Sequence, residues 1–465
     1  MEYFSLLGVA TVVIAALTLA LYRKTKNVGF IIGVAALYYW TLYGAWYIVI
    51  DKTGGFSGKH YQYLEGKMFA LALDDDYMLT LALYAGFIIL IQLTLLITLK
   101  VDKRTEIPRL MMHHGPILVL AALAGLGSLY IIKDKLSEAW ALNTSAYFYT
   151  RRETGQWFTL HQLLNRVAML PVAIGFATLA AGEHSRYFVS VVRRYTWPGY
   201  LAVFAGMAAF TFVLGNKNEG FTMLLMGLLA YLASVRRPSL VKTGLVVIAG
   251  MWFLAAVDFF RGTPISEMRE ALNQRVEEAS DVGNFVTSSN EAFAAHFSMY
   301  GVLAAGVEPQ FGYSIYSLTC SAIPRILWPE RPPDIYDYYA DSVGVNRNQG
   351  YTVHHATGWY LNFGYAGIAL GAIVMGLLWA SFCNAHQRIR AESGLLFRLF
   401  ATIAPWVFVA GLPSLIRAGP EGYKGLVLDG LLIPLAVLTL ACRPKKEAAK
   451  FVWDPRAGWV AAEAK

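Results

Sequence analysis

Two adjacent histidines, His354 and His355, lie a few residues before an apolar run that is long enough to cross a membrane. Imidazole changes charge near neutral pH, so a histidine at such a border could take a proton from a reacting hydroxyl group. Glu291 and His296 are weaker candidates for the same proton transfer. The alternative is that the pair only hydrogen-bonds the surrounding loop at the membrane interface.

A second set of residues could supply fixed positive charge for a diphosphate group. Arginine suits this task because its planar fork makes two parallel contacts and keeps its charge. The candidates are Arg151, Arg152, Lys217, Arg261, Arg325, Arg331, Arg417 and Lys424. The alternative for each of them is contact with lipid headgroups or a solvated ion pair.

One further cation, Arg166, lies inside an apolar segment. His161, Gln162, Asn165 and Arg166 recur at positions that share one face of a helix, which predicts that this face contacts protein or water. An ionisable residue within a span indicates a functional site. A structural clamp between Arg166 and either Asp429 or Asp258 is the alternative.

The elements that position these residues are membrane helices. The chain has 465 residues, of which 56% are hydrophobic and only 15% charged, a composition that excludes a soluble globule. Backbone in lipid satisfies its own hydrogen bonds as helix, so we expect an all-α polytopic protein of about eleven spans. The expected spans are 3–22, 28–50, 77–99, 115–133, 157–181, 197–215, 219–234, 240–258, 364–383, 399–415 and 424–441.

The distribution of lysine and arginine predicts the orientation. The segments 23–26, 100–109, 186–194, 236–242, 388–398 and 443–465 hold 22 of the 39 basic residues, against 10 in the short loops of the other side. Basic loops stay in the cytoplasm, so the N-terminus is expected outside and the C-terminus inside. The net charge of +8 then reflects orientation and anionic lipid, and no nucleic-acid partner is expected.

One large external segment interrupts this pattern. We expect four parts: helices 1–8 over residues 1–258, a large periplasmic loop over 259–363, helices 9–11 over 364–441, and a cytoplasmic tail over 442–465. The loop is expected to carry amphipathic helices at the outer interface, with a re-entrant pair as the alternative, followed by a rigid proline-rich stretch. Long loops are usually functional. Because the outer face has no ATP, chemistry there needs activated substrates such as lipid-linked diphosphates.

The stretches "IPRILWPERPP" and "HHATGWYLNFGYAGIALG" resemble the external loop and the following helix of bacterial Wzy-type oligosaccharide repeat-unit polymerases. The resemblance extends more distantly to the O-antigen ligases and, in span count and loop position, to most of the chain. It implies a GT-C-like fold in the bacterial inner membrane with an active site that faces the periplasm. The mid-chain turn departs from the family, because Lys217 stands where an arginine is usual.

The resemblance implies metal-independent glycosyl transfer without a cofactor. The growing chain on undecaprenyl diphosphate would be the donor and a second lipid-linked repeat unit the acceptor, with membrane lipids, a flippase and a chain-length regulator as partners. Arg325 is the best single candidate for the diphosphate, and His354 or His355 for the base.

Three alternative functions remain open. An O-antigen ligase would differ only in its acceptor. A metal-dependent GT-C glycosyltransferase would use an early acidic motif such as Asp74–Asp76, although we interpret that motif first as a solvated helix N-terminus stabilised by the helix dipole. A lipid-linked oligosaccharide flippase or transporter would show internal repeats, and we detect none.

Overall fold

The computed structural model describes most of the chain. The residues outside this description are 1, 53–73, 101–108, 142–156, 192–195, 215–216, 236–240, 242, 245–247, 249, 251–266, 268, 271–272, 274–290, 322, 324–326, 329, 334, 345–351, 391, 445–450, 455–457 and 462–465.

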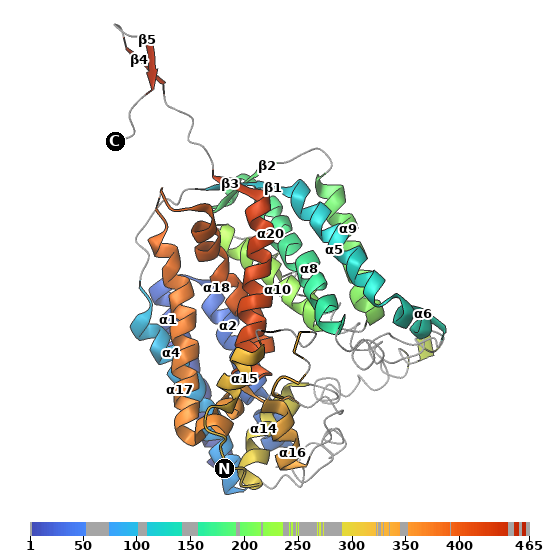
Figure 1. Cartoon of the computed structure of the whole chain (residues 1–465). Helices are drawn as coiled ribbons and strands as arrows, with labels where there is room; N and C mark the ends of the chain where they lie inside the picture. Colours follow the sequence, from blue (N-terminus) through green and yellow to red (C-terminus); the bar gives the residue numbers. More distant parts are fainter. Residues whose placement is uncertain are drawn as a thin grey trace.

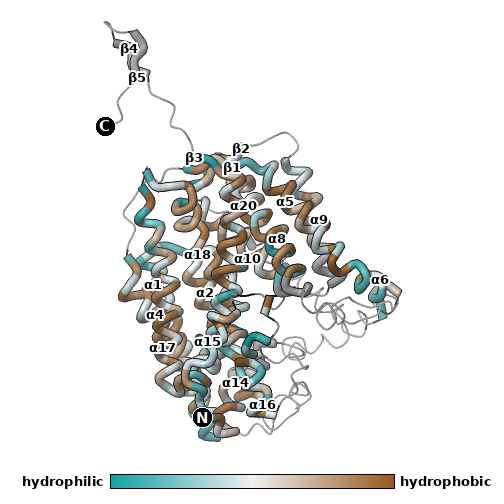
Figure 2. The backbone as a smooth tube through the Cα atoms, viewed as in Figure 1, coloured by the Kyte–Doolittle hydropathy of each residue, from teal (hydrophilic) through white to brown (hydrophobic). Residues whose placement is uncertain are grey.

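The described part is a helical bundle (Figure 1). Its long helices are α1 (Glu2–Thr25), α2 (Val28–Tyr38), α4 (Asp75–Thr98), α5 (His114–Ile131), α8 (Trp157–Ala181), α9 (Thr196–Leu214), α10 (Lys217–Ser234), α17 (His355–Ala385) and α18 (Leu395–Ile416). Two spans contain a π-helical segment. Helix α2 continues through η1 (Tyr39–Tyr43) into α3 (Gly44–Lys52), and the last span runs from α19 (Gly422–Lys424) through η7 (Gly425–Leu432) into α20 (Ile433–Ala441). Figure 2 shows hydrophobic residues along these helices.

Eight helices in the described residues are long and apolar enough to cross a membrane, so the chain is a multi-pass membrane protein. They coincide with eight of the expected spans. Helices α9 and α10 occupy the spans expected over 197–215 and 219–234, and α10 contains a shorter apolar helix. Most of the span expected over 240–258 lies outside the described residues.

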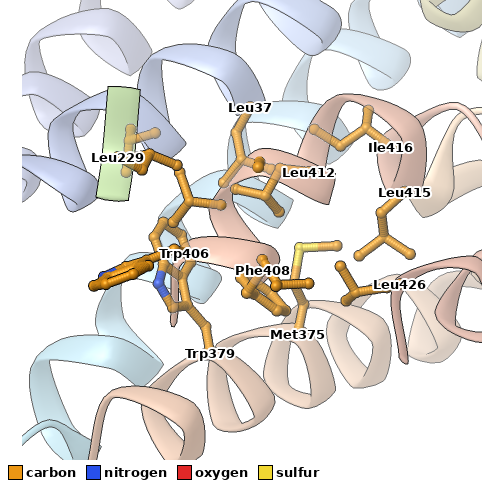
Figure 3. Packing of buried hydrophobic residues seen from close by; sticks show 14 of the residues in the cluster. Leu37, Leu229, Met375, Trp379, Trp406, Phe408, Leu412, Leu415, Ile416 and Leu426 are labelled. Carbon is orange, nitrogen blue, oxygen red and sulfur yellow. The ribbon is translucent and has the colours of Figure 1, made fainter. Parts of the chain in front are cut away.

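The core lies between helices that are distant in the sequence. Helix α8 packs between α5 and α10, and α17 packs against α4 and α18. The fully buried Trp379 of α17 stacks on Phe30 of α2 at 5.2 Å between ring centroids. Its other neighbours include Phe408 of α18, and Figure 3 shows this packing. These contacts fix the later helices against the first ones.

The two ends of the bundle differ. The N-terminus lies at the same end as α14 (Glu291–Ala304), α15 (Tyr313–Ser321) and α16 (Ile335–Val343), which are the described helices of the large loop (Figure 1). The last span ends at the opposite end. The loop and the N-terminus therefore share one side, as expected, and the assignment of that side to the periplasm remains a prediction.

A small sheet at the opposite end was not expected in an all-α protein. Strand β1 (Leu110–His113) pairs in parallel with β2 (Phe188–Val191) and antiparallel with β3 (Cys442–Pro444). Because these short segments lie outside the helices, their backbone N–H and C=O groups have no helical partners. Strand pairing supplies the missing hydrogen bonds. In the tail, β4 (Phe451–Asp454) and β5 (Gly458–Ala461) form a separate antiparallel hairpin.

Helix α14 differs from the amphipathic interfacial helix expected in the loop. Every residue from Ala295 to Val302 is buried, because α14 packs against η1, α3, α4, α16 and α17. A helix covered on all sides belongs to the protein core. Helix α16 does show an apolar face, with Ile335, Tyr339, Ala340 and Val343 buried.

Helix α17 is two helices joined at a kink. Phe363 leaves helical geometry, and Gly364 has φ 62° and ψ −147°, a backbone conformation that essentially only glycine adopts. The second part begins where the ninth span was expected. The first part, from His355 to Asn362, instead packs against the residues that follow α18. The histidine pair at its start therefore lies inside the protein.

Candidate functional site

The candidate site is built around the turn that joins α18 to the last span. Helix α18 ends at Ile416, and the sequence "RAGPEGYKG" places Gly419 and Pro420 where a helix cannot easily continue. The amide of Lys424 donates to the carbonyl oxygen of Glu421 at 3.0 Å, which closes the short helix α19. Glu421 and Lys424 are therefore held by the same tight turn.

This turn borders a cavity of about 350 Å³ between α8, α10, α18 and η7. Five charged residues line it: Arg166, Glu219, Glu421, Lys424 and Asp429. The rest of the wall is largely apolar and includes Met169, Leu170, Met226, Val407, Leu415 and Leu426. A cavity with charged and apolar walls can hold an amphiphilic molecule.

Arg166 pairs with Asp429 at the wall of the cavity. Its Nη1 lies 2.9 Å from Oδ2 of Asp429, and it also donates to the carbonyl oxygen of Gly425 at 3.3 Å. Gly425 begins η7, and π-helical turns inside α-helices are frequent at functional sites. Of the two clamp partners left open by the sequence, Asp429 is the one observed, while Asp258 lies outside the described residues. A clamp does not exclude binding, because Arg166 also lines the cavity.

His161 and Asn165 of α8 contact a different helix. Oγ of Ser128 on α5 lies 2.8 Å from Nδ1 of His161 and donates to Oδ1 of Asn165 at 2.9 Å. Both His161 and Asn165 are buried. Their polar face thus looks into protein, as expected, but only Arg166 of this set reaches the cavity.

Two predicted arginines surround the turn. Arg331 donates to the carbonyl oxygens of Ser321 and Ile323 at 3.3 and 3.2 Å, and its charge, like that of Arg166, acts on Lys424. The guanidinium carbon of Arg417 lies 5.1 Å from the centre of the Trp40 ring, a cation–π contact. Arg166 and Lys424 thus line the cavity together with three carboxylates, Arg331 lies near Lys424, and Arg417 lies at the end of α18.

His354 connects the large loop to the first helices. Its Nδ1 accepts the amide of Ala356 at 3.1 Å, so Nε2 carries the hydrogen and donates to Oγ1 of Thr41 at 3.0 Å. Its own amide donates to Oγ of Ser298 at 2.9 Å. The ring is fully buried, and burial together with the neighbouring histidines lowers its pKa well below the usual value.

His355 supports the turn instead. Its Nδ1 donates to the carbonyl oxygen of Ala418 at 2.9 Å, and its Nε2 lies 3.3 Å from the hydroxyl of Tyr423. The backbones also meet closely here: a Cβ on Gly358 would lie 2.6 Å from Cα of Gly419, so only glycine fits. The first turn of α17 thus packs directly on residues 418–423.

His296 completes a buried network. Its Nδ1 donates to the carbonyl oxygen of Thr41 at 2.6 Å, and its Nε2 accepts from Tyr77 at 3.0 Å. Burial lowers its pKa to about 4, so the ring is neutral at neutral pH. The three histidines join η1, α4, α14 and α17, and none of them lines the cavity. A catalytic role for His354 or His355 stays a prediction, while these contacts favour a positioning role.

Several predicted residues lie outside this geometry. Arg151, Arg152, Arg261 and Arg325 fall outside the described residues. Lys217 and Glu291 begin α10 and α14, and the structure describes their backbone but not the surroundings of their side chains. The assignments of these six residues stay predictions.

The early acidic motif is used to start a helix. Oδ1 of Asp74 accepts the amide of Tyr77 at 2.9 Å, which caps α4, and Oδ2 accepts the hydroxyl of Tyr300 at 3.0 Å. Asp75 and Asp76 occupy the first turn. Among the described residues no group of three or more histidine, cysteine or acidic side chains is arranged to hold a metal ion.

Sequence reasoning missed two carboxylates of the cavity, Glu219 and Glu421. Both stand in the turns that supplied Lys217 and Lys424 as candidates, so the signal was an acidic residue beside each selected lysine. Comparison of the chain with protein-family models, curated proteins and solved structures finds no match.

Proposed function

We propose that this chain is a glycosyltransferase of the bacterial inner membrane that joins undecaprenyl-diphosphate-linked oligosaccharide units into a polysaccharide on the periplasmic face. The observation that supports the proposal best is the cavity beside the loop end of the bundle, in which Arg166 and Lys424 adjoin an apolar wall. A lipid diphosphate has the same two parts, a charged headgroup and an isoprenoid chain. The resemblance in the loop agrees with this substrate.

The cations would act on the leaving group. When the bond between the anomeric carbon and the phosphate oxygen breaks, negative charge develops on the lipid diphosphate, and fixed cations in a water-poor site stabilise that charge. Lys424 and Arg166 line the cavity, and the charge of Arg331 acts on Lys424. Arg325, which precedes Arg331 by six positions in the same loop, is proposed to join them.

The histidine pair would keep the site in place. His355 bonds the 418–423 turn, and His354 bonds η1 and α14, so together they hold the loop and the cavity in one geometry. Catalysis depends on positions held to within a fraction of an ångström. This role is compatible with their burial.

The test is polymerisation with purified protein in lipid nanodiscs. Lipid-linked oligosaccharides extracted from cells in which the gene is deleted supply the substrate, and the product is resolved as a ladder on a gel. Wild type should give a ladder, while Arg166→Ala and Lys424→Ala should each lose at least about tenfold in rate, as expected for lost transition-state charge stabilisation.

The matched control is Arg390→Ala. Arg390 is highly exposed and pairs only loosely with Glu392 at 3.9 Å, at the end of the bundle opposite the loop. It should polymerise like wild type. A wild-type protein that neither forms a ladder nor gains thermal stability from undecaprenyl diphosphate would refute the proposed function.

A further inference from the structure

We propose that Glu421 is the general base that accepts the proton of the acceptor hydroxyl. The inference rests on the proposed function and names a residue that the loop resemblance does not supply. Glu421 lines the cavity three positions before Lys424, within the same hydrogen-bonded turn. A carboxylate there lies beside the cation that would neutralise the leaving diphosphate.

Glu421 also touches the external loop. Its Oε1 accepts the amide of Ile335, the first residue of α16, at 3.1 Å. An ionised carboxylate can accept about four hydrogen bonds, so the bond from Ile335 uses only part of the acceptor capacity of the side chain. Because α16 belongs to the loop through which a periplasmic sugar would arrive, the carboxylate lies at the border between loop and cavity.

The other two carboxylates of the cavity fit this role less well. Asp429 is held in the ion pair with Arg166 at 2.9 Å and lies on η7, away from the contact with the external loop. Glu219 lies in the first turn of α10, on the same helix face as Thr222 and Met226. It therefore belongs to the α10 wall of the cavity and not to the turn that carries Lys424. Glu421 is the carboxylate in contact with both the loop and the Lys424 turn.

The neighbouring residues hold Glu421 in position. Gly419 has no room for a side chain, because a Cβ there would lie 2.6 Å from both Oε2 of Glu421 and Cγ2 of Ile335. His355 bonds Ala418 and Tyr423 on either side of Glu421. The carboxylate is therefore placed by contacts from α16, α17 and its own turn, as a group that must meet a reacting atom requires.

The step balances without a cofactor. The acceptor oxygen attacks the anomeric carbon of the donor sugar and forms the new glycosidic bond. The bond from that carbon to the phosphate oxygen breaks, and its electron pair leaves with the undecaprenyl diphosphate. The hydroxyl proton passes to the carboxylate of Glu421 and from there to solvent.

Glu421→Gln separates catalysis from structure. The amide oxygen of glutamine can still accept the amide of Ile335, so the loop contact survives while proton acceptance is lost. We expect the rate at saturating substrate to fall by roughly 100-fold or more, while thermal stabilisation by undecaprenyl diphosphate stays within about twofold of wild type. Glu308→Gln, an exposed carboxylate elsewhere in the loop, should match wild type.

A second variant tests the proton acceptor directly. Glu421→Ala opens space for a small carboxylate, and added sodium formate should restore part of the ladder in that variant and not in Arg166→Ala.

Three outcomes would overturn the inference. The first is a Glu421→Gln variant that polymerises normally. The second is a Glu421→Ala variant that loses activity and is not rescued by formate, and the third is a loss of activity in Glu219→Gln while Glu421→Gln stays active. Failure of the proposed function is separate, because wild type itself would then form no ladder.

Discussion

The indole Nε1 of Trp359 donates a hydrogen bond to Nε2 of His355 at 3.0 Å. Indole nitrogen is only a donor and a carbonyl oxygen only an acceptor, so these two neighbours fix the hydrogen of His355 on Nδ1, toward Ala418. To accept a proton at Nε2, the ring would first have to lose the bond from Trp359. This arrangement supports a positioning role for His355 over a role as base.

The first prediction compares two substitutions of His355. Asparagine can place an N–H close to the position of Nδ1 and keep the bond to Ala418, whereas alanine cannot. We expect His355→Ala to destabilise the protein by about 1–3 kcal/mol, the usual cost of a lost buried hydrogen bond, and to abolish the polymer ladder. His355→Asn should recover most of the activity. An Asn variant as inactive as Ala, with normal thermal stability, would instead identify His355 as the base.

The sequence was informative about the spans and much less so about the site. Eight expected spans agree with the helices because length and hydropathy decide insertion before any packing is known. The π-helical segments η1 and η7, which pack against α14, α8 and α18, have no comparable signature in the sequence. The carbonyl groups of Thr41 and Gly425, which bond His296 and Arg166, were therefore not predictable.

Single residues show the same difference. Arg166 was recognised because a charge inside a span is rare, whereas the choice between Asp429 and Asp258 as its partner needed the fold. Glu421 was missed because an acidic residue in a polar turn is ordinary, and only the fold brings it to a cavity and to Ile335. The histidine pair was expected at the border of a span, whereas its burial depends on α14 and on residues 417–423.

The second prediction concerns the kink in α17. Gly364 has φ 62° and ψ −147°, a conformation that costs other residues about 1–3 kcal/mol. Gly364→Ala should lower the thermal stability and reduce activity by displacing the first turn of α17, which carries His355. Gly8→Ala is the control, because a Cβ at Gly8 meets no atom within 4 Å. Equal melting temperatures for the two variants would contradict the assigned role of the kink.

The third prediction tests the topology. In a background with Cys320, Cys383 and Cys442 replaced by alanine, Ser342→Cys in the loop should react with a membrane-impermeant maleimide from the periplasmic side. Both Ser342 and the opposite-end residue Arg390 are exposed. Arg390→Cys should react only after the membrane is opened. Reversed labelling of the two positions would place the loop in the cytoplasm and exclude a periplasmic site.

The fourth prediction concerns acid stability. The folded pKa of His296 is about 4, below the 6.5 expected when the chain is unfolded, so the unfolded state binds more protons between these values. The stabilising contribution is complete above pH 6.5 and is lost as the pH falls toward 4. The free energy of unfolding should decrease by about 1.4 kcal/mol per pH unit for this proton in the middle of the window.

Buried His354 has a lowered pKa as well and should add to the same slope. His296→Asn keeps a donor for the Thr41 carbonyl oxygen and does not titrate, so its unfolding free energy should depend less steeply on pH. Thermal unfolding in detergent at a series of pH values measures both slopes. Identical slopes for the variant and wild type would show that His296 is not neutral in the fold.

The last prediction separates the two roles of Arg166, clamp and ligand. The pair with Asp429 is about one-quarter exposed on each side, so the ion pair itself should contribute only about 1 kcal/mol to stability. Asp429→Asn removes the competing carboxylate and leaves the guanidinium in the cavity. If a diphosphate replaces Asp429 as the partner of Arg166, this variant should bind undecaprenyl diphosphate more tightly than wild type, although it melts at a lower temperature.

Arg166→Ala should weaken binding by about tenfold or more, and Arg166→Lys should recover little, because a point charge does not replace the planar fork. Binding is measured as the rise in melting temperature with added undecaprenyl diphosphate, with undecaprenol as the uncharged control. Weaker binding by both Asp429→Asn and Arg166→Ala would show that the intact pair is required and that Arg166 is a clamp alone.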